Sequence, residues 1–352
     1  MNIHEFYIKR CIEIAKNGLG HTYPNPSVGC VIVHKETIIG EGYTSPPGQA
    51  HAEVNAIHSV SDPSLLTEST LYVTLEPCSH YGRTPPCADL IITHKIPRVV
   101  IGTLDSNKEV LGKGVRKLEE AGIEVITGIL EQECRELNRR FLCFHEKQRP
   151  YIILKWAESN DGFIAPPSDP DKKPEPVWLS NSGSRQLVHK WRSEEMGILI
   201  GTRTAILDNP RLDTRTWYGN SPVRFVIDLN LKIPTRYHVL DKSVRTIIIT
   251  LAENCPESTD MLQYEKVFIA NGLPNEICRI AVKYGIQSLI VEGGAQTINS
   301  FISEDLWDEA RVFTAPIKLF GGVQAPKIEI TPISGMFIEN DKVSLYRNKP
   351  VN

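Results

Sequence analysis

The sequence reads His51-Ala52-Glu53 and, further on, Pro77-Cys78-Ser79-His80-Tyr81-Gly82-Arg83-Thr84-Pro85-Pro86-Cys87. Zinc takes imidazole nitrogen and thiolate sulfur in a tetrahedron, and a catalytic site keeps one position for water. The metal lowers the pKa of that water to about 7, so that hydroxide is available near neutral pH. Nucleobase deaminases carry His-x-Glu followed by Pro-Cys-x-x-Cys, with the Glu as acid and base. Here eight residues separate the two cysteines instead of two.

The pattern around these two stretches predicts an α/β sandwich built on one sheet. Expected helices lie at 4–19, 52–59, 87–93, 113–121 and 130–147, and expected strands at 28–33, 37–42, 70–75, 99–101 and 125–126. The first two strands have the spacing of a hairpin. Strands and helices alternate after it, so the rest of the sheet is predicted to be mostly parallel.

A second domain is predicted after Arg149-Pro150, where the helical pattern stops. We therefore expect domains at 1–147 and 148–352. Expected strands of the second domain lie at 151–155, 197–200, 223–227, 246–250, 266–269 and 288–291, and expected helices at 184–194, 275–284 and 295–301. The proline-rich segment 166–176 is predicted to be a surface loop.

Composition excludes several classes of protein. The 352 residues suit two domains, and 39 Lys and Arg against 42 Asp and Glu give a net charge of −3, which disfavours a strongly basic nucleic-acid binder. No apolar run approaches the roughly 18 residues of a membrane span. The first residues lack the pattern of a signal peptide, so we expect a cytoplasmic protein. In that compartment, its eight cysteines are expected as thiols or metal ligands rather than disulfides.

Two other interpretations of the zinc motif remain open. A closed structural site would need a fourth protein ligand, and Cys30, His58 and His80 are the candidates nearby in the sequence. Such a site would fit a zinc-stabilised, non-catalytic interaction protein. Alternatively, the chain is a deaminase of nucleic-acid bases with a C-terminal binding module, although its charge argues against that.

The second domain has no strong motif of its own. It lacks Gly-x-Gly-x-x-Gly, which argues against a Rossmann dinucleotide fold. Val291-Glu292-Gly293-Gly294-Ala295 follows a predicted strand and opens a predicted helix. Its backbone is suited to a phosphate or pyrophosphate, but a tight strand-to-helix turn explains it equally well.

The first domain resembles the bifunctional riboflavin-biosynthesis deaminase/reductase family. The matching stretches are Thr22-Tyr23-Pro24-Asn25-Pro26-Ser27-Val28-Gly29, residues 51–53 and residues 77–87. The eight-residue spacer with Gly-Arg-Thr-Pro-Pro distinguishes this family from cytidine and tRNA-adenosine deaminases. The resemblance implies a cytidine-deaminase-like three-layer α/β/α domain. It also implies zinc on His51, Cys78 and Cys87, Glu53 as the proton shuttle, and substrate contacts at Asn25 and Arg83.

The second domain resembles the reductase half of the same family, which has the dihydrofolate-reductase-like α/β fold and binds NADPH. The resemblance implies cofactor contacts at Ala157, Trp178, Thr204, Asp208, Gly294, Ala295, Gln296, Thr297, Ile298, Asn299 and Ser300. It implies substrate contacts at Arg192, Leu212, Arg215 and Glu292, the two arginines on the substrate phosphate. Where the family commonly has a serine that touches substrate, this chain has Pro176.

The resemblance implies two consecutive steps of riboflavin biosynthesis. Zinc hydroxide would deaminate 2,5-diamino-6-(5-phosphoribosylamino)pyrimidin-4(3H)-one, and NADPH would then reduce the ribosyl chain to ribityl. Lys155, near the end of a predicted strand, is either the proton donor of the reduction or a surface lysine. We expect one Zn²⁺ per chain and NADPH as cofactors, a small-molecule substrate, a homo-oligomer, and neither nucleic acid nor membrane as partner.

Overall fold

The computed structural model of the chain describes residues 2–81, 85–106, 111–167 and 177–348. The chain divides into two compact units, one formed mainly by residues 1–148 and the other by residues 149–350. Within the described ranges, no helix is long and apolar enough to cross a membrane. The two units are described separately below.

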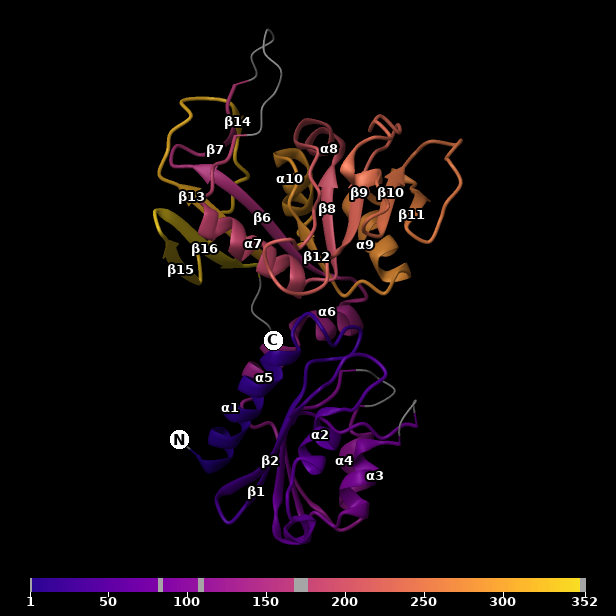
Figure 1. Cartoon of the computed structure of the whole chain (residues 1–352), viewed down its shortest axis with the longest axis vertical. Helices are drawn as coiled ribbons and strands as arrows, with labels where there is room; N and C mark the ends of the chain where they lie inside the picture. The colour runs from indigo at the N-terminus through magenta and orange to yellow at the C-terminus, as the bar shows by residue number, and fades with distance from the viewer. Residues whose placement is uncertain (1, 82–84, 107–110, 168–176, 349–352) are drawn as a thin grey trace. The chain divides into compact units, whose positions relative to one another are not determined.

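The first unit is built on a five-stranded sheet among its described residues, in the order β2-β1-β3-β4-β5. Figure 1 draws this unit in indigo to magenta. The strands are β1 Gly29–His34, β2 Thr37–Tyr43, β3 Thr70–Leu75, β4 Arg98–Thr103 and β5 Glu124–Thr127. As predicted, β1 and β2 form an antiparallel hairpin. The β1 strand also pairs antiparallel with β3, whereas β3, β4 and β5 are parallel to one another. The carboxyl ends of β3 and β4 therefore lie at the same edge of the sheet.

Helices cover both faces of this sheet and make three layers. They are α1 Ile3–Ala15, α2 Ala52–His58, α3 Cys87–Thr93, α4 Lys113–Glu120, α5 Glu131–Leu137 and α6 Arg139–Lys147. Alternate strand residues point to opposite faces. Leu71 and Val73 pack with α2, α3 and α4 in one core cluster, while Tyr72 packs with α1 and α5 in the other. This arrangement confirms the predicted three-layer α/β/α fold.

The second unit holds a nine-stranded sheet in its described part, in the order β11-β10-β9-β8-β12-β6-β13-β16-β15. Its strands are β6 Tyr151–Ser159, β8 Gly197–Gly201, β9 Val223–Ile227, β10 Thr246–Thr250, β11 Leu262–Lys266, β12 Ser288–Val291, β13 Glu309–Ala315, β15 Ser334–Ile338 and β16 Asp341–Arg347. All neighbours are parallel except β13–β16 and β15–β16. Two short strands, β7 Phe163–Ala165 and β14 Val323–Gln324, form a separate antiparallel pair.

The helices of the second unit flank this sheet and are α7 Ser182–Glu194, α8 Thr202–Asp208, α9 Leu273–Lys283 and α10 Ala295–Ser303. The core on one face joins α9 and α10 to the central strands through residues such as Ile280, Phe301 and Leu154. On α7, Trp191 packs on Phe313 of β13, with ring centroids 5.4 Å apart. The α8 helix begins directly after β8, and α10 begins after a three-residue turn that follows β12, so both N-termini lie at the carboxyl edge of the sheet.

Three predicted elements differ from the structure. The helix expected at 4–19 ends at Ala15 and continues as a short 3-10 turn. The single helix expected at 130–147 is two helices, α5 and α6, which meet at Asn138. The strand expected at 266–269 lies at Leu262–Lys266. The sequence analysis also missed β7 and every strand after α10.

Candidate active sites

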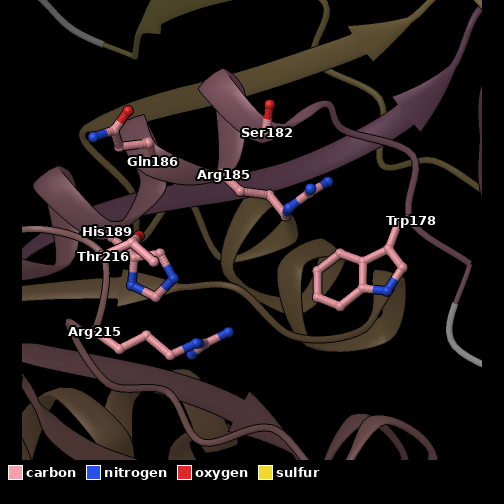
Figure 2. A pocket seen from close by; sticks show the side chains of 7 residues that line it. All are labelled: Trp178, Ser182, Arg185, Gln186, His189, Arg215 and Thr216. Atoms are coloured by element: carbon pink, nitrogen blue, oxygen red, sulfur yellow. The ribbon is translucent and has the colours of Figure 1, made fainter.

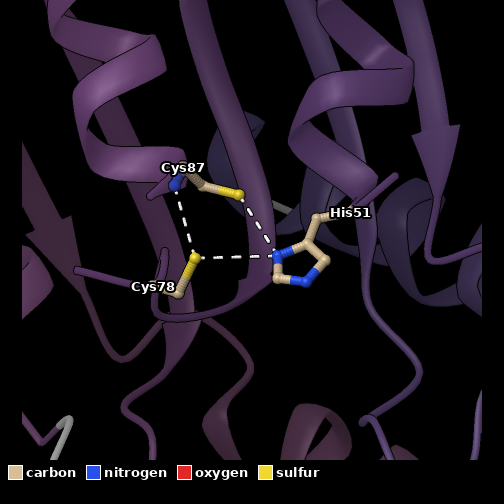
Figure 3. A group of neighbouring side chains, drawn as sticks. All are labelled: His51, Cys78 and Cys87. Atoms are coloured by element: carbon tan, nitrogen blue, oxygen red, sulfur yellow. Dashed lines mark hydrogen bonds between the residues drawn. The ribbon is translucent and has the colours of Figure 1, made fainter. Parts of the chain in front are cut away.

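In the first unit, three metal-ligating side chains converge from three different segments. His51 is the residue that caps the N-terminus of α2, Cys78 follows β3, and Cys87 is the first residue of α3. His51 Nδ1 lies 3.6 Å from Cys78 Sγ and 3.4 Å from Cys87 Sγ (Figure 3). The Cys87 backbone N–H donates a hydrogen bond to Cys78 Sγ at 3.3 Å. One nitrogen and two sulfur atoms thus face a common point.

These three atoms have the spacing that a tetrahedral zinc ion requires. Zinc lies about 2.3 Å from sulfur and about 2.1 Å from nitrogen, so two such ligands at a tetrahedral angle are about 3.6 Å apart. The observed separations from His51 to the two sulfurs match this value closely. The donor set and its geometry therefore fit zinc without rearrangement.

A fourth protein ligand is not part of this cluster. Within the described ranges, the group that could hold a metal consists of His51, Cys78 and Cys87. Cys30, which the sequence leaves open as a fourth ligand, is fully buried in β1, and burial raises the pKa of its thiol. Three protein ligands leave one position for water, as in catalytic zinc sites.

Hydrogen bonds within the cluster shift the pKa values of its ligands. The contact with Cys87 lowers the pKa of Cys78 to about 4, and the same contact raises the pKa of Cys87. A hydrogen bond to Cys78 also raises the pKa of His51. Metals bind thiolate and neutral imidazole, so the shift at Cys78 favours ligation, whereas a metal must displace a proton at Cys87.

Glu53 lies beside the cluster on the first turn of α2, and its side chain is buried, with 4% of its surface exposed. Burial raises the pKa of this carboxyl to about 7, and the charge of Cys78 adds to the effect. A carboxyl group with a pKa near neutrality can both accept and release a proton. Among the described residues, Glu53 is not a member of the metal-ligating group, which consists of His51, Cys78 and Cys87.

Glu76 is a feature of this site that the sequence analysis did not single out. It directly follows β3, two residues before Cys78, and is 4% exposed. Its carboxylate accepts backbone N–H groups from Asp105, Gly112, Gly114 and Val115, at 2.9–3.3 Å. It thereby joins the loop after β4 and the start of α4 to the segment that carries Cys78. The signal available in the sequence was a glutamate directly after the strand predicted at 70–75.

The structure describes one of the two predicted substrate contacts of this unit. Asn25 is half-buried in the turn before β1, where its backbone N–H donates to Thr22. No hydrogen bond joins it to the zinc ligands in the described part of the chain. Arg83 lies outside the described residues.

The second unit contains a cavity of about 2310 Å³ at the carboxyl edge of its sheet. The turn between β12 and α10 borders it. Gly294 has φ +62, which a side chain would strain, and a Cβ on Gly293 would come within 2.7 Å of Ile200. These two glycines let the backbone of the turn approach both β8 and the cavity. An NADPH-sized ligand fits a cavity of this volume, and the free N–H groups at the start of α10 suit its phosphates.

Three charged side chains meet at the centre of this cavity. Glu292, directly after β12, accepts hydrogen bonds from Arg192 on α7 at 2.7 and 3.1 Å. Lys155 Nζ on β6 lies 4.0 Å from the same carboxylate, and its side chain is only 16% exposed. Although burial opposes ionisation, Arg192 and Lys155 lower the pKa of Glu292 to about 2. Burial lowers the pKa of Lys155. Lys155 is therefore a cavity residue and not a surface lysine.

The cavity brings together nearly all of the predicted reductase residues. Those that line it are Ala157, Trp178, Arg192, Thr204, Asp208, Leu212, Arg215, Glu292, Gly294, Ala295, Gln296, Thr297, Ile298 and Ser300. Asn299 is the exception, since it is exposed on α10 and does not border the cavity. Arg185 and His189 also line it (Figure 2), and the sequence analysis did not single them out. Their signal was their spacing on α7, seven and three residues before Arg192.

Two family models match the chain. "Cytidine and deoxycytidylate deaminase zinc-binding region" matches residues 1–103, and "RibD C-terminal domain" matches residues 150–332. The first covers the three zinc-ligand candidates and Glu53. The second covers the residues around the large cavity.

Several curated proteins and solved structures are similar over almost the whole chain. Riboflavin biosynthesis protein RibD of Aquifex aeolicus is 41% identical over 324 residues, which are 91% of this chain and 88% of the relative. RibD of Bacillus amyloliquefaciens is 42% identical over 334 residues, with coverages of 93% and 88%. The crystal structure of a diaminohydroxyphosphoribosylaminopyrimidine deaminase/5-amino-6-(5-phosphoribosylamino)uracil reductase from Thermotoga maritima has a TM-score of 0.87 at 33% identity, covering 98% of both chains.

Proposed function

Because the chain belongs to the RibD family, the bifunctional deaminase/reductases of riboflavin biosynthesis, we propose that it catalyses both reactions on one phosphoribosyl-pyrimidine. The first is hydrolytic deamination of 2,5-diamino-6-(5-phosphoribosylamino)pyrimidin-4(3H)-one, and the second is NADPH reduction of the ribosyl chain to ribityl. Residues 1–147 are the zinc-dependent deaminase domain, and residues 148–352 are the reductase domain. The observation that carries this proposal is that Glu53 and a three-ligand zinc cluster lie in one compact unit, and the Lys155–Glu292 pair lies in the other.

In the deaminase domain, His51, Cys78 and Cys87 would hold one zinc ion. When bound, zinc would supply an activated water for attack on the amino-bearing ring carbon. Glu53, beside these ligands, would accept a proton and deliver one to the departing amino group, which would leave as ammonia. Its pKa of about 7 suits both transfers, because proton transfer is most effective when the pKa lies near the working pH. Asn25 and Arg83 are proposed to hold the substrate.

Zinc removal should separate the two activities. We expect the purified protein to contain one zinc per chain and to lose deaminase activity when a chelator removes the metal. Reductase activity on supplied deaminated substrate should remain, because its proposed residues belong to the other unit. Metal analysis with parallel assays of both steps measures this. A fully active deaminase after complete zinc removal would contradict the metal assignment.

In the reductase domain, Ala157, Trp178, Thr204, Asp208 and the start of α10 border the proposed NADPH site. When bound, NADPH supplies the hydride. Lys155 donates a proton to the reacting group of the opened ribose, and its lowered pKa makes it a stronger acid. Glu292 orients Lys155 and binds the substrate hydroxyl groups. Arg192, which the resemblance pairs with the phosphate, also holds Glu292 through two hydrogen bonds.

Arg215 is the phosphate ligand in this proposal, and its loss should weaken substrate binding alone. Arg215 borders the cavity and donates to Asp213 at 2.6 Å. A charge-assisted hydrogen bond contributes about 1.5–3 kcal/mol, so Arg215→Ala should raise the substrate KM about 10–100-fold. The KM for NADPH should change little. An unchanged substrate KM, or an effect on NADPH only, would reject the assignment.

The proposed function is tested by incubating the purified protein with the diaminopyrimidine ribose phosphate and measuring product masses. Without NADPH, the mass should change only by exchange of an amino for a hydroxyl group. With NADPH, it should also gain two hydrogens. Reduction without deamination, or no change in either sample, would contradict the proposed sequence of steps.

We further propose that the enzyme is a cytoplasmic homo-oligomer that binds neither nucleic acid nor membrane. Eight free thiols and a net charge of −3 support the compartment and the absence of a nucleic-acid partner. Met336 and Phe337 lie on the edge strand β15 and are 47% and 73% exposed, which supports association of copies. Light scattering gives the oligomeric state, and a monomer at working concentration would contradict it.

A further inference from the structure

The buried carboxylate of Glu76 is fully occupied by contacts within the first unit. Its Oε1 accepts the backbone N–H groups of Gly114 and Val115, at 2.9 and 3.3 Å. Its Oε2 accepts those of Gly112 and Asp105, at 3.0 and 3.2 Å. A carboxylate offers about four acceptor positions, so these four donors use its whole capacity. Glu76 therefore holds other parts of the chain to its own segment rather than facing a ligand.

These contacts cap α4 from a distant part of the sequence. The first N–H groups of a helix have no partner within the helix, and negative charge is favourable near them. Gly112, the residue that caps the N-terminus of α4, has no side chain to bond them, and Glu76 takes this role. A Cβ on Gly114 would lie 2.1 Å from the carbonyl oxygen of Pro77. The start of α4 therefore lies directly against the segment that follows β3.

The same helix is tied to both cysteine ligands. Through Glu76 it is joined to the segment that reaches Cys78 two residues later. Further along α4, Lys117 Nζ lies 2.5 Å from Asp89 Oδ1 on α3, the helix that begins with Cys87. Figure 3 shows the two cysteines side by side, with one on a loop and the other at the start of a helix. The α4 helix thus supports the two segments that bring the sulfur atoms together.

We propose that Glu76 is a positioning residue of the zinc site. Its carboxylate fixes the start of α4 against the segment that carries Cys78, and thereby holds Cys78 and Cys87 in place as ligands. The inference rests on the proposed deaminase function and deepens it. Glu76 is not itself one of the metal-ligating residues among the described part of the chain. Residues that orient metal ligands typically change metal affinity or activity about 10–100-fold when they are replaced.

Glu76→Gln tests this role. Glutamine keeps the size of the side chain but has one acceptor oxygen, and its amide N–H groups would face backbone N–H groups that need an acceptor. Zinc release to an excess of chelator should become about 10–100-fold faster, and deaminase kcat should fall by a similar factor. Reduction of supplied deaminated substrate should not change. If Glu76 only stabilised α4, the variant would unfold at a lower temperature, but the folded protein would release zinc and deaminate at wild-type rates.

Gly114→Ala is the second variant, in case Glu76→Gln does not fold. Its methyl group would force the start of α4 away from Pro77 while the carboxylate of Glu76 remains, and zinc release should again become faster. Glu119→Gln is the matched control, because it makes the same chemical change at an exposed position of α4. The control should release zinc at the wild-type rate. Wild-type zinc release in folded Glu76→Gln, or an equal acceleration in Glu119→Gln, would overturn the inference.

Amide hydrogen exchange tests the wild-type, zinc-loaded protein directly. The amides of Gly112, Gly114 and Val115 should be protected, because Glu76 binds N–H groups that would otherwise exchange with water. Exchange of these amides at unprotected rates would contradict the inference. If Glu76→Gln releases zinc faster but the wild type does not deaminate, the proposed function fails and the positioning role stands. If the wild type deaminates and Glu76→Gln matches it in turnover and zinc release, the positioning role fails.

Discussion

Glu53→Gln is expected to lower deaminase turnover about 10²–10⁴-fold, the contribution typical of a positioned general acid and base. The amide keeps the size of the buried side chain but cannot take up or release a proton. Zinc content should remain at one per chain, because Glu53 is not among the metal-ligating residues. Reduction of supplied deaminated substrate should proceed at the wild-type rate. Rates of both steps and metal analysis on the same preparation measure these effects.

Glu68→Gln is a suitable control for this variant. Glu68 lies in the same unit, its side chain is 67% exposed, and its nearest cation is Lys35 at 3.8 Å. The control should retain both activities. If Glu53→Gln abolished reduction as well as deamination in a folded protein, the assignment of the two activities to separate sites would be wrong.

Lys155→Met is expected to affect the other step: reductase kcat should fall about 10²–10⁴-fold while deamination continues. Methionine keeps the apolar stem of the lysine and removes its proton-donating group. Glu292 remains paired with Arg192 through two hydrogen bonds, so the variant leaves no isolated buried charge. Product analysis in the presence of NADPH should then show accumulation of the deaminated, unreduced compound.

Lys342→Met on the exposed side of β16 is the matched control and should reduce normally. The KM for NADPH should also stay unchanged in Lys155→Met, because the proposed role concerns the substrate proton. A variant with wild-type kcat would eliminate Lys155 as the proton donor. If the variant lost only its affinity for NADPH, Lys155 would be assigned to the cofactor site instead.

The buried parallel strands were predictable, whereas elements that depend on distant partners were not. Runs such as 246–250 consist entirely of β-branched residues with three isoleucines at the centre, and β10 is fully buried between two parallel neighbours. By contrast, β13 contains Glu309 and Arg311, which look unfavourable in a core strand. Arg311 is buried because it pairs with Glu309 and with Glu195, more than a hundred positions away. No local pattern reveals such a partner.

Two local misplacements have similar causes. Asn138 is neither a proline nor a glycine, yet α5 ends and α6 begins there. Its side chain accepts a hydrogen bond from the Ser27 backbone N–H, a contact with a distant segment. The sequence predicted a strand at 266–269 because the run from Val267 to Ile269 is apolar. In the structure, β11 precedes this run and carries mostly polar residues. As the last strand on its side of the sheet, β11 pairs only with β10 among the described strands and needs less apolar surface.

The candidate sites likewise contain residues that local sequence reveals and residues that only the fold brings together. His51, Cys78 and Cys87 could be found from spacing because zinc chemistry fixes both the residue types and their number. The pairing of Arg192 with Glu292 joins positions a hundred residues apart and emerges only in the fold. Arg185 and His189 carry no motif, and they border the cavity only because α7 places them there in the folded chain. Sequence reasoning identifies ligands of a known metal more readily than a cavity assembled from separate loops.

The central claim is that two independent sites in one chain carry out consecutive steps, and mixing the two inactive variants tests it most directly. With NADPH and the diaminopyrimidine ribose phosphate, Glu53→Gln alone should leave the substrate unchanged, and Lys155→Met alone should stop at the deaminated compound. A mixture of the two should form the ribityl product, because the intermediate released by one protein is reduced by the other. If the mixture forms no ribityl product although Glu53→Gln reduces supplied intermediate and Lys155→Met deaminates, the claim is contradicted.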